Sequence, residues 1–348
     1  MLPGDKEGGC VCSRFVAVTE AAALAAADLL GRDDAVAADT AARNAMAAEL
    51  GRTAIRGRIV AGRAGNPDTR AMTVGSGVGR ESGPWYSSRV GAGEELTDDP
   101  EVWDLALDPL QAPNSLARGM GGALAILAAG PSGSLMPVPE MYMQKLIVPT
   151  AAGKTIDLDA PLCDNLSAVA AALGRRPADL TVVVLDRPRH EDLISQIRRC
   201  GARVSLISDG DVTAGLAVAT GDSGVDMCVG IGGSTEGILT AAILRCTGGE
   251  MQARFWPISR QQVEMVRAAG IEDLEAKLTS SDMAGEGVLV SATAVTGNRF
   301  LNGVDVRPFG IRTHSVVLCS RCNKIQKIKT IHRATNTGQP VHLGTPWD

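Results

Sequence analysis

The spacing of hydrophobic positions divides the chain into a helical beginning and a longer region in which strands and helices alternate. Runs of alanine and leucine, which are strong helix formers, predict helices over residues 17–30 and 38–50. Short apolar runs followed by turn residues predict strands over 54–62 and 102–108. The segment between these strands, 64–101, is rich in glycine, serine and proline, which is typical of a long surface excursion.

From about residue 155 the pattern predicts βαβ units around a mostly parallel sheet. The predicted strands are 180–186, 202–208 and 225–233, and the predicted helices are 164–174, 190–201, 211–220 and 235–249. Ligands of open α/β sheets gather at the carboxyl ends of the strands. We therefore expect binding residues in the polar loops 186–190, 209–211 and 230–236.

Composition and charge narrow the class of protein. A length of 348 residues favours about two domains, and 45% hydrophobic with 21% charged residues is ordinary for a globular chain. The net charge of -5 argues against a nucleic-acid partner held by counterion release. No apolar run reaches the ~18 residues of a membrane span, and the first residues lack the pattern of a secretory signal. We therefore predict a cytoplasmic protein without a nucleic-acid or membrane partner.

The eight cysteines are scattered along the chain, which favours reduced, buried thiols over a disulfide framework. Cys10-x-Cys12 and Cys319-x-x-Cys322 could together offer four thiolates to zinc. The CxxC spacing occurs only once, however, and the residues around it have the β-branched content of a strand. We interpret these cysteines as incidental thiols and keep zinc binding as the alternative.

The loop DRPRH, residues 186–190, places Arg187, Arg189 and His190 where a predicted strand meets a helix. Guanidinium groups, together with backbone N–H groups at the start of a helix, suit a phosphate. Taken alone, this loop also fits a solvated turn with ordinary ion pairs.

Two further loops carry acids and glycines. In ISDGDV, residues 207–212, Asp209 and Asp211 flank a glycine and could receive sugar hydroxyls or cap the following helix. In VGIGGSTEG, residues 229–237, the glycines permit a close approach to the backbone, and Glu236 follows them. The glycine spacing does not match the GxGxxG pattern of dinucleotide-binding proteins.

Nine segments follow one another along the chain: VTEAAALAA, ADTAARNAM, GRIVAG, LDPLQAP, EMYMQKLIVP, IDLDAPLCDNL, DRPRH, ISDGDV and GIGGSTEG. In this order and spacing, over roughly residues 12–335, they closely resemble the class II fructose-1,6-bisphosphatases, including members that also accept sedoheptulose bisphosphate. The resemblance implies a two-domain layered α/β sandwich of the lithium-sensitive sugar-phosphatase type. Residues 12–155 would carry the metal side and 156–335 the sugar-phosphate loops, with the last strands free to pack on the first domain, before a loosely ordered tail, 336–348.

The resemblance also implies a homo-oligomer and a site at the domain junction for a small phosphorylated sugar and for Mg or Mn. The implied metal ligands are Asp39, Asp108 and Glu236. The positions that match the family's sugar-phosphate residues are Tyr142, Arg187, Pro188, Arg189, Asp209, Gly210, Asp211 and Gly233.

The hydrolytic half departs from the family pattern. Where the family has G-E-G-E, this chain has GRAG from residue 62, so two acids are lost and Arg63 introduces a cation. Where the family has D-P-(I/C)-(D/E)-G-T, Asp108 remains, but the second acid is Gln111 and the threonine is Pro113. Counting Glu to Arg as two charges and Glu to Gln as one, the site is about three units less negative, which disfavours divalent cations.

These substitutions predict a protein that binds a phosphorylated ketose or related sugar, with metal-dependent bisphosphatase activity weak or lost. We assign catalytic positions to Asp108, Arg63 and Gln111, with Arg63 taking over charge neutralisation from a lost metal. Three other readings stay open. The chain could be an enzyme that hydrolyses another ester or carries out a non-hydrolytic step on a bound monophosphate. The retained acids and Asp68 could hold one metal and allow slow hydrolysis, or the chain could be an inactive regulatory partner of an active homologue.

Overall fold

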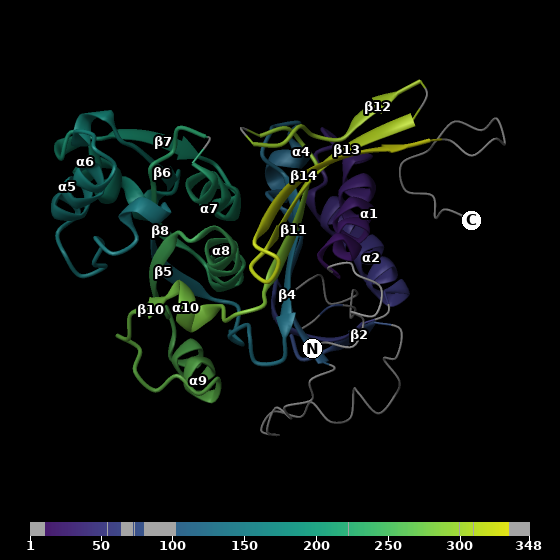
Figure 1. Cartoon of the computed structure of the whole chain (residues 1–348), viewed down its shortest axis with the longest axis horizontal. Coiled ribbons are helices and arrows are strands. Elements are labelled where there is room, and N and C mark those ends of the chain that lie inside the picture. Colours follow the sequence, from purple (N-terminus) through teal and green to yellow (C-terminus); the bar gives the residue numbers. More distant parts are fainter. Residues whose placement is uncertain are drawn as a thin grey trace.

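Helices and two mixed β-sheets alternate in five layers (Figure 1). The computed structural model describes residues 11–53, 55–63, 72, 74–79, 102–221, 223–298, 300–308 and 310–333. Helices α1 (Val16–Ala27) and α2 (Ala35–Arg52) cover the outer face of the first sheet, and α5 (Leu162–Ala172) and α6 (Glu191–Arg199) cover the outer face of the second. Helices α7 (Asp211–Thr220) and α8 (Ser234–Thr247) lie between the sheets.

Each contact between layers is filled by its own apolar cluster. Helices α1 and α2 bury Val18 and Met46 against the first sheet, and α5 buries Leu166 against the second. Helix α8 buries residues such as Ile238 and Leu239. Because sheets flank α8 on both sides, it is apolar around most of its circumference rather than along one stripe.

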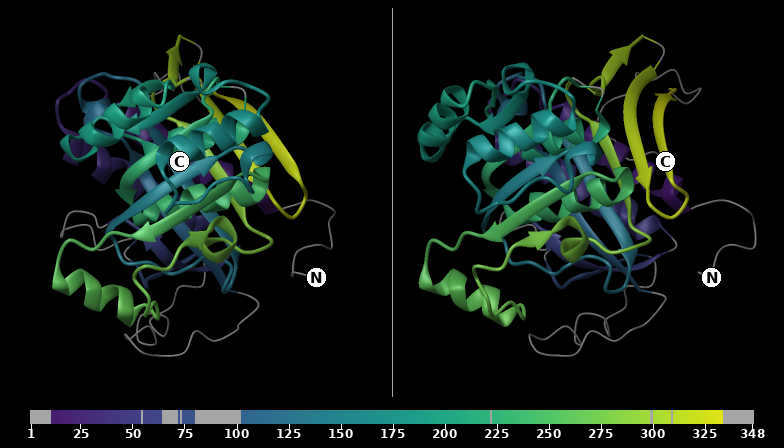
Figure 2. Two further views of the ribbon diagram at one scale, coloured as in Figure 1. Left: turned by 90° about the vertical axis from the view of Figure 1, so that its left-hand side faces the viewer. Right: turned by 60° about the vertical axis from the view of Figure 1, so that its left-hand side comes forward.

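The first sheet has the strand order β12-β13-β11-β4-β3-β1-β2, with β14 paired to β13. Its strands are β1 (Arg56–Gly62), β2 (Gly77–Gly79), β3 (Val102–Gln111), β4 (Leu124–Pro131), β11 (Leu289–Ala294), β12 (Asp305–Arg307), β13 (Gly310–Cys319) and β14 (Lys324–His332). Only β1 and β3 pair in parallel. Figure 2 shows the β13–β14 hairpin along the edge of this sheet.

The second sheet has the order β10-β9-β5-β8-β6-β7. Its strands are β5 (Tyr142–Val148), β6 (Thr181–Leu185), β7 (Arg203–Ile207), β8 (Met227–Gly233), β9 (Glu250–Phe255) and β10 (Leu278–Thr279). Strand β6 runs parallel to β7 and β8, as the pattern predicted. The prediction of a mostly parallel sheet is wrong at β5, which enters antiparallel between β8 and β9 from an earlier part of the chain.

The remaining described helices are short: η2 (Val11–Phe15), α4 (Pro113–Ala117), η3 (Thr150–Ala152), η4 (Pro177–Asp179), η5 (Pro188–His190), α9 (Arg260–Ala268) and α10 (Ser280–Met283). Within the described ranges, every helix is too short or too polar to cross a bilayer.

The predicted two-sheet α/β class and the predicted helices and strands are confirmed, with ends that differ by a few residues. The boundary near residue 155 does not separate the sheets, because β5 belongs to the second and β11 to β14 to the first. The division into a domain 12–155 that carries the metal side and a domain 156–335 that carries the sugar-phosphate loops stays a prediction. Most of the excursion 64–101 and the tail 336–348 lie outside the described residues.

One disulfide corrects the expectation that all cysteines are reduced. Cys163 in α5 and Cys200, directly after α6, are bonded, with their Cα atoms 5.2 Å apart. The two helices pack on the same face of the second sheet, which brings the cysteines within disulfide range. This proximity is a property of the fold that scattered sequence positions do not show.

Candidate functional site at the junction of the sheets

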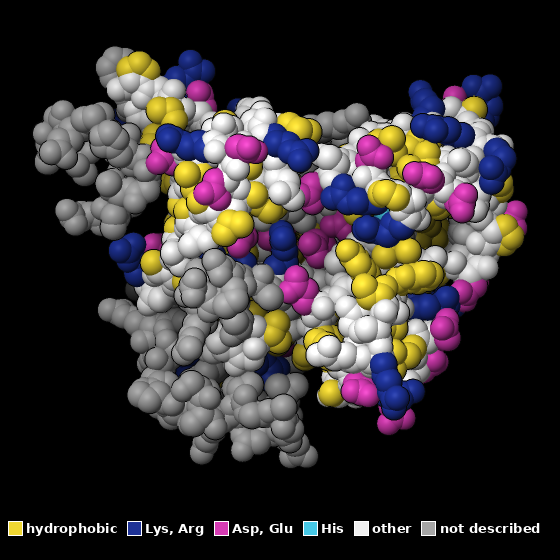
Figure 3. Space-filling model, turned by 180° about the vertical axis from the view of Figure 1, so that it is seen from behind, with side chains coloured by type: hydrophobic (Ala, Val, Ile, Leu, Met, Phe, Trp, Pro, Cys, Tyr) yellow, Lys and Arg dark blue, Asp and Glu magenta, His cyan; other side chains and the backbone are white. Residues whose placement is uncertain are grey.

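The predicted site residues gather where the two sheets meet. The end of β3 lies beside the start of α7, where Gln111 contacts Thr213. The end of β1 lies near the start of α8, since the charge of Glu236 acts on Arg63. Seen from behind, basic and acidic side chains lie along this junction (Figure 3).

Arg63, directly after β1, lies among acids from four different elements. The carboxylate of Asp108 has the largest effect in raising the pKa of Arg63, against burial, which lowers it. Glu236 of α8, Asp39 of α2 and Asp209 before α7 raise it further. The guanidinium therefore stays protonated and supplies positive charge at the centre of an acidic cluster.

Asp108 is fully buried in β3, and among the described residues neither of its carboxylate oxygens has a hydrogen-bond partner. Burial raises the pKa of Asp108, and the positive charge of Arg63 opposes that rise. A buried acceptor without a hydrogen bond costs roughly 1–3 kcal/mol. Such a group in a native fold calls for a ligand, an ion or a functional explanation.

The side-chain amide of Gln111 forms hydrogen bonds through its oxygen but not through its nitrogen within the described residues. Its Oε1 accepts hydrogen bonds from the backbone N–H and the hydroxyl of Thr213, at 3.2 and 3.3 Å. Its buried Nε2 has no hydrogen-bond partner within the described ranges. The amide therefore ties the first sheet to the start of α7 through its oxygen, while its NH2 group finds no acceptor there.

Arg43 is a site residue that the sequence analysis missed. It is almost completely buried and donates to the backbone oxygen of Arg63 and to Oδ2 of Asp39, both at 3.2 Å. The i,i+4 spacing of an acid and an arginine on a predicted helix is the signal that could have indicated this pair. Asp39 is thus already neutralised from within the protein.

Lys145 of β5 was also missed as a functional residue. Its buried Nζ forms a 2.6 Å ion pair with Asp211 and a 2.9 Å hydrogen bond to the backbone oxygen of Gly233. A side chain at Gly232 would collide with Asp211, and one at Gly233 would collide with Glu236. The two glycines therefore permit Asp211 of α7 and Glu236 of α8 to lie against the backbone at the end of β8.

The predicted phosphate loop is held by contacts to β8 and β5. Arg189 donates through Nη2 to the backbone oxygen of Ile231 at 2.8 Å, and its guanidinium lies 4.8 Å from the centre of the Tyr142 ring. Pro188 opens η5, and Arg187 precedes it. The positive charge of Arg187 lowers the pKa of Asp209, which burial raises more strongly. The predicted sugar-phosphate residues therefore come from the first residue of β5, the last residue of β8, and the loops and helix starts that follow β6 and β7.

His190 fixes this loop internally. Its Nδ1 lies 2.8 Å from the backbone oxygen of Leu185, and its Nε2 accepts the N–H of Ile231 at 2.8 Å. This pattern requires the neutral imidazole with the proton on Nδ1. Burial lowers the pKa of His190, in agreement with the neutral form.

The predicted metal ligands Asp39, Asp108 and Glu236 surround one charge centre, but that centre is Arg63. In the described part of the chain, their oxygens do not form a group in which all lie within 4.8 Å of one another. Mg and Mn bind to clusters of oxygen ligands. The described donor set on its own does not present such a cluster.

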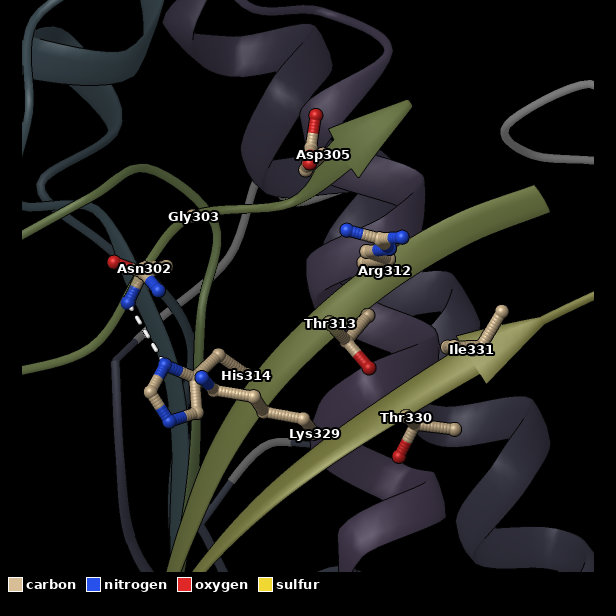
Figure 4. A pocket seen from close by; sticks show the side chains of 9 residues that line it. All are labelled: Asn302, Gly303, Asp305, Arg312, Thr313, His314, Lys329, Thr330 and Ile331. Carbon is tan, nitrogen blue, oxygen red and sulfur yellow. Dashed lines mark hydrogen bonds between the residues drawn. The ribbon is translucent and has the colours of Figure 1, made fainter. Parts of the chain in front are cut away.

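A separate hollow of about 270 Å³ lies on the first sheet (Figure 4). Within it, the N–H of Asn302 donates to Nδ1 of His314 at 3.0 Å. The hollow is lined by Asn302, Gly303, Asp305, Arg312, Thr313, His314, Lys329, Thr330 and Ile331. None of the predicted site residues lines it, so the junction remains the candidate site.

The five-layer arrangement, with acids, arginines and glycine loops meeting at the junction of two sheets, defines a two-domain α/β protein of the sugar-phosphatase type. The sequence profile of bacterial fructose-1,6-bisphosphatase, glpX-encoded, matches residues 10–332. The chain therefore belongs to the class II fructose-1,6-bisphosphatase family.

Two relatives match this chain in sequence over 91% of its length. The D-fructose 1,6-bisphosphatase class 2/sedoheptulose 1,7-bisphosphatase of Synechococcus sp. (strain JA-3-3Ab) is 36% identical over 331 residues, 91% of this chain and 94% of the relative. The fructose-1,6-bisphosphatase 1 class 2 of Escherichia coli (strain K12) is 37% identical over 332 residues, with the same shares covered. The predicted family is confirmed. The family consists of metal-dependent phosphoric monoester hydrolases of carbohydrate metabolism.

Proposed function

We propose that this chain binds a phosphorylated ketose at the junction of the sheets and hydrolyses fructose 1,6-bisphosphate slowly with Mg or Mn. The observation that carries the proposal is the position of Arg63 among Asp39, Asp108 and Glu236. A guanidinium in this place supplies the positive charge that a cation would otherwise bring. It also repels a cation that approaches the same acids.

The binding half of the proposal rests on the loops of the second sheet. Arg189 uses only part of its guanidinium on Ile231, so donors remain for a phosphate. Arg187 donates through Nη1 to the neighbouring backbone oxygen of Asp186 at 3.0 Å. We assign the phosphate to Arg187, Pro188 and Arg189.

We assign the sugar hydroxyls to the acids and backbone beside these arginines. The members of this group are Tyr142, Asp209, Gly210, Asp211 and Gly233. Asp211 is already paired with Lys145 and so is oriented before a ligand arrives. A carboxylate held in this way receives a hydroxyl without first losing side-chain freedom.

One observation favours the second candidate, a phosphatase with altered metal use. Both oxygens of Asp108 are buried and lack hydrogen bonds, so they are available to a cation that displaces the Arg63 side chain. In that case Asp39, Asp108 and Glu236 would hold it. An inactive regulatory protein would share the binding loops but would release no phosphate under any condition.

Phosphate release by the unaltered protein separates these candidates. We expect turnover of fructose 1,6-bisphosphate and sedoheptulose 1,7-bisphosphate far below the ~1–1000 per second usual for enzymes, across a series of Mg and Mn concentrations. The E. coli relative serves as the positive control in the same assay. Brisk turnover would contradict the slow-hydrolysis proposal, and thermal shifts with fructose 6-phosphate test binding independently.

Restoring the lost acids tests the role of Arg63. Arg63→Glu combined with Gln111→Glu should tighten Mn binding without full turnover, and adding Ala112→Gly with Pro113→Thr should recover part of the rate. Groups that act as a unit are strongly non-additive, so single changes should show little. Arg52→Glu, at an exposed position at the end of α2, makes the same two-unit charge change as Arg63→Glu alone and should leave Mn binding unaltered.

The homo-oligomeric state and the cytoplasmic location stay predictions. Light scattering of the purified protein measures the first, and fractionation of the host cell measures the second.

A further inference from the structure

Three cysteines from distant parts of the sequence meet beside the first sheet. Cys12 lies in η2, Cys319 ends β13, and Cys322 lies in the turn that leads to β14. Their sulfur atoms all lie within 4.8 Å of one another. No other set of three His, Cys, Asp or Glu residues in the described ranges comes this close.

The turn that carries two of them is well anchored. Cys319 is the last residue of β13 paired with β14, opposite Lys324, so residues 320–323 form the turn. The backbone N–H and the hydroxyl of Ser320 both donate to the backbone oxygen of Val288, at 3.0 and 2.8 Å. Asn323 adopts the left-handed conformation, with φ 48°, directly after the second cysteine. The turn therefore holds both sulfurs toward Cys12 without help from a ligand.

This spacing and distance suit zinc. CxxC is the ligand spacing of structural zinc sites, and Zn–S bonds are ~2.3 Å, so tetrahedral thiolates lie ~3.8 Å apart. Sulfurs that already lie within 4.8 Å need to move by about 1 Å or less to reach that separation. Thiolates select zinc over the oxygen-preferring Mg and Mn.

Other arrangements of cysteine in the same protein differ from this one. Cys163 and Cys200 form an isolated pair, which a disulfide satisfies completely. Cys246 lies near the cluster, but its Sγ donates to the backbone oxygen of Val288 at 3.5 Å, as a protonated thiol does. The cluster instead brings three sulfurs to one point, where a single Zn²⁺ can bind them together.

We propose that Cys12, Cys319 and Cys322 bind one Zn²⁺ as thiolates and so tie η2 to the β13–β14 hairpin. Binding forms three Zn–S bonds, and each bound thiol releases its proton to solvent. Cys10, two residues before Cys12, lies outside the described residues. None of these cysteines belongs to the junction site, so the inference stands apart from the proposed function.

The full chain, purified with reductant and without added metal, should contain about one zinc per chain by elemental mass spectrometry. Replacement by Co²⁺ should give thiolate-to-metal charge-transfer absorption and the visible bands of tetrahedral cobalt. Three or four thiolates by this spectrum support the proposal. Fewer than three thiolates, or zinc far below one per chain after incubation with excess zinc, would overturn it.

Variants locate the metal. Cys319→Ser and Cys322→Ser should each weaken zinc affinity by more than the ~10-fold to 100-fold that changes beyond the ligands produce. Cys228→Ser is the matched control, because Cys228 is also buried but lies in β8 of the second sheet. Asp108→Asn should keep its zinc, which separates this site from the junction. Unchanged zinc in Cys319→Ser and Cys322→Ser would refute the assignment.

A ligand variant that fails to fold would not decide the matter, so a second measurement uses the unaltered chain. Removal of zinc by a strong chelator should lower the melting temperature, and added zinc should restore it. Mass spectrometry after alkylation in denaturant should find Cys12, Cys319 and Cys322 as thiols. A disulfide between any two of them in freshly purified protein would contradict the proposal.

Discussion

The two sides of the junction differ in how their polar groups are satisfied. On the second-sheet side, Lys145 pairs with Asp211, and Arg189 and His190 bind the backbone of Ile231. On the first-sheet side, neither oxygen of Asp108 has a hydrogen bond from the described residues. The predicted departures from the family pattern, Arg63, Gln111 and Pro113, lie on this side. The second-sheet side therefore satisfies its polar groups internally, whereas the first-sheet side leaves a buried carboxylate open to a ligand or an ion.

On the first-sheet side of the junction, Ala112 has a left-handed backbone conformation, which glycine adopts more readily than alanine. Ala112 precedes α4 with φ 61°, in the left-handed region where the family pattern has glycine. A left-handed L-residue costs roughly 1–2 kcal/mol. Ala112 is therefore a strained position at the start of α4.

The largest expected loss of unfolding free energy comes from breaking the buried ion pair between Lys145 and Asp211, on the second-sheet side. Lys145→Met leaves Asp211 as an uncompensated buried charge, and the loss of unfolding free energy should be about 3–5 kcal/mol by urea denaturation. Arg58→Met is the control on the other sheet, because Arg58 forms an equally short buried pair with Asp104 away from the junction. Both should lose stability, but only Lys145→Met should lose fructose 6-phosphate binding. Equal binding by the two variants would show that Lys145 has no part in the site.

A second test concerns the disulfide between Cys163 and Cys200 on the second-sheet side. Reduction should lower the unfolding free energy by about 2–4 kcal/mol, because the cross-link restricts the unfolded chain. The double variant Cys163→Ser, Cys200→Ser should be insensitive to dithiothreitol, measured by its melting temperature in matched buffers. Equal sensitivity in this variant would assign the effect to other thiols.

A third test concerns ligand binding by the retained loops. Fructose 6-phosphate at 100 times its Kd should stabilise the folded state by about 2.7 kcal/mol. Arg189→Ala should abolish this stabilisation, whereas Arg176→Ala, an exposed arginine next to η4, should preserve it. Retention of the shift in Arg189→Ala would remove this arginine from the site.

On the first-sheet side, Ala112→Gly should raise the unfolding free energy by about 0.5–1 kcal/mol, since relief of the left-handed strain exceeds the added entropy of the unfolded chain. Urea denaturation at neutral pH measures it. Ala117→Gly, at the end of α4 in ordinary helical geometry, should instead lower stability. A loss at both positions would mean that Ala112 is not strained.

The smallest expected effect is the contribution of His190 to the pH dependence of the unfolding free energy. The folded-state pKa of His190 lies below its ordinary value, so the unfolded chain takes up this proton first as the pH falls. The stability due to neutral His190 is complete above the unfolded pKa of about 6.5 and declines below it. His190→Gln should remove this part of the decline between pH 7.5 and 5.5, seen as the difference between two urea titration series. Parallel series would show that His190 does not titrate in this range.

Periodicity predicted α7 to the residue, because a glycine-bounded apolar run leaves little choice of ends. The order of the motifs, through the family resemblance, predicted that the loops 186–190, 209–211 and 230–236 lie close together. The sequence could not show that β5 inserts between β8 and β9, or that Cys163 and Cys200 meet, since both depend on long-range packing. Lys145 was missed because its partner Asp211 is 66 residues away in the sequence. Arg43 was missed because its bond to the backbone of Arg63 depends on how α2 packs beside the end of β1.

The outer strand of the first sheet has a consequence for how this protein meets its neighbours. Among the described strands, β14 pairs only with β13, so one side of its backbone faces outward. Lys324, Lys327 and Lys329 stand along it. A second copy that added its own β14 to this edge would bring two rows of lysines together, and lysines on outer strands discourage such sheet extension. Self-association of this protein should therefore use a surface other than this edge, and the same lysines should oppose fibril growth from it.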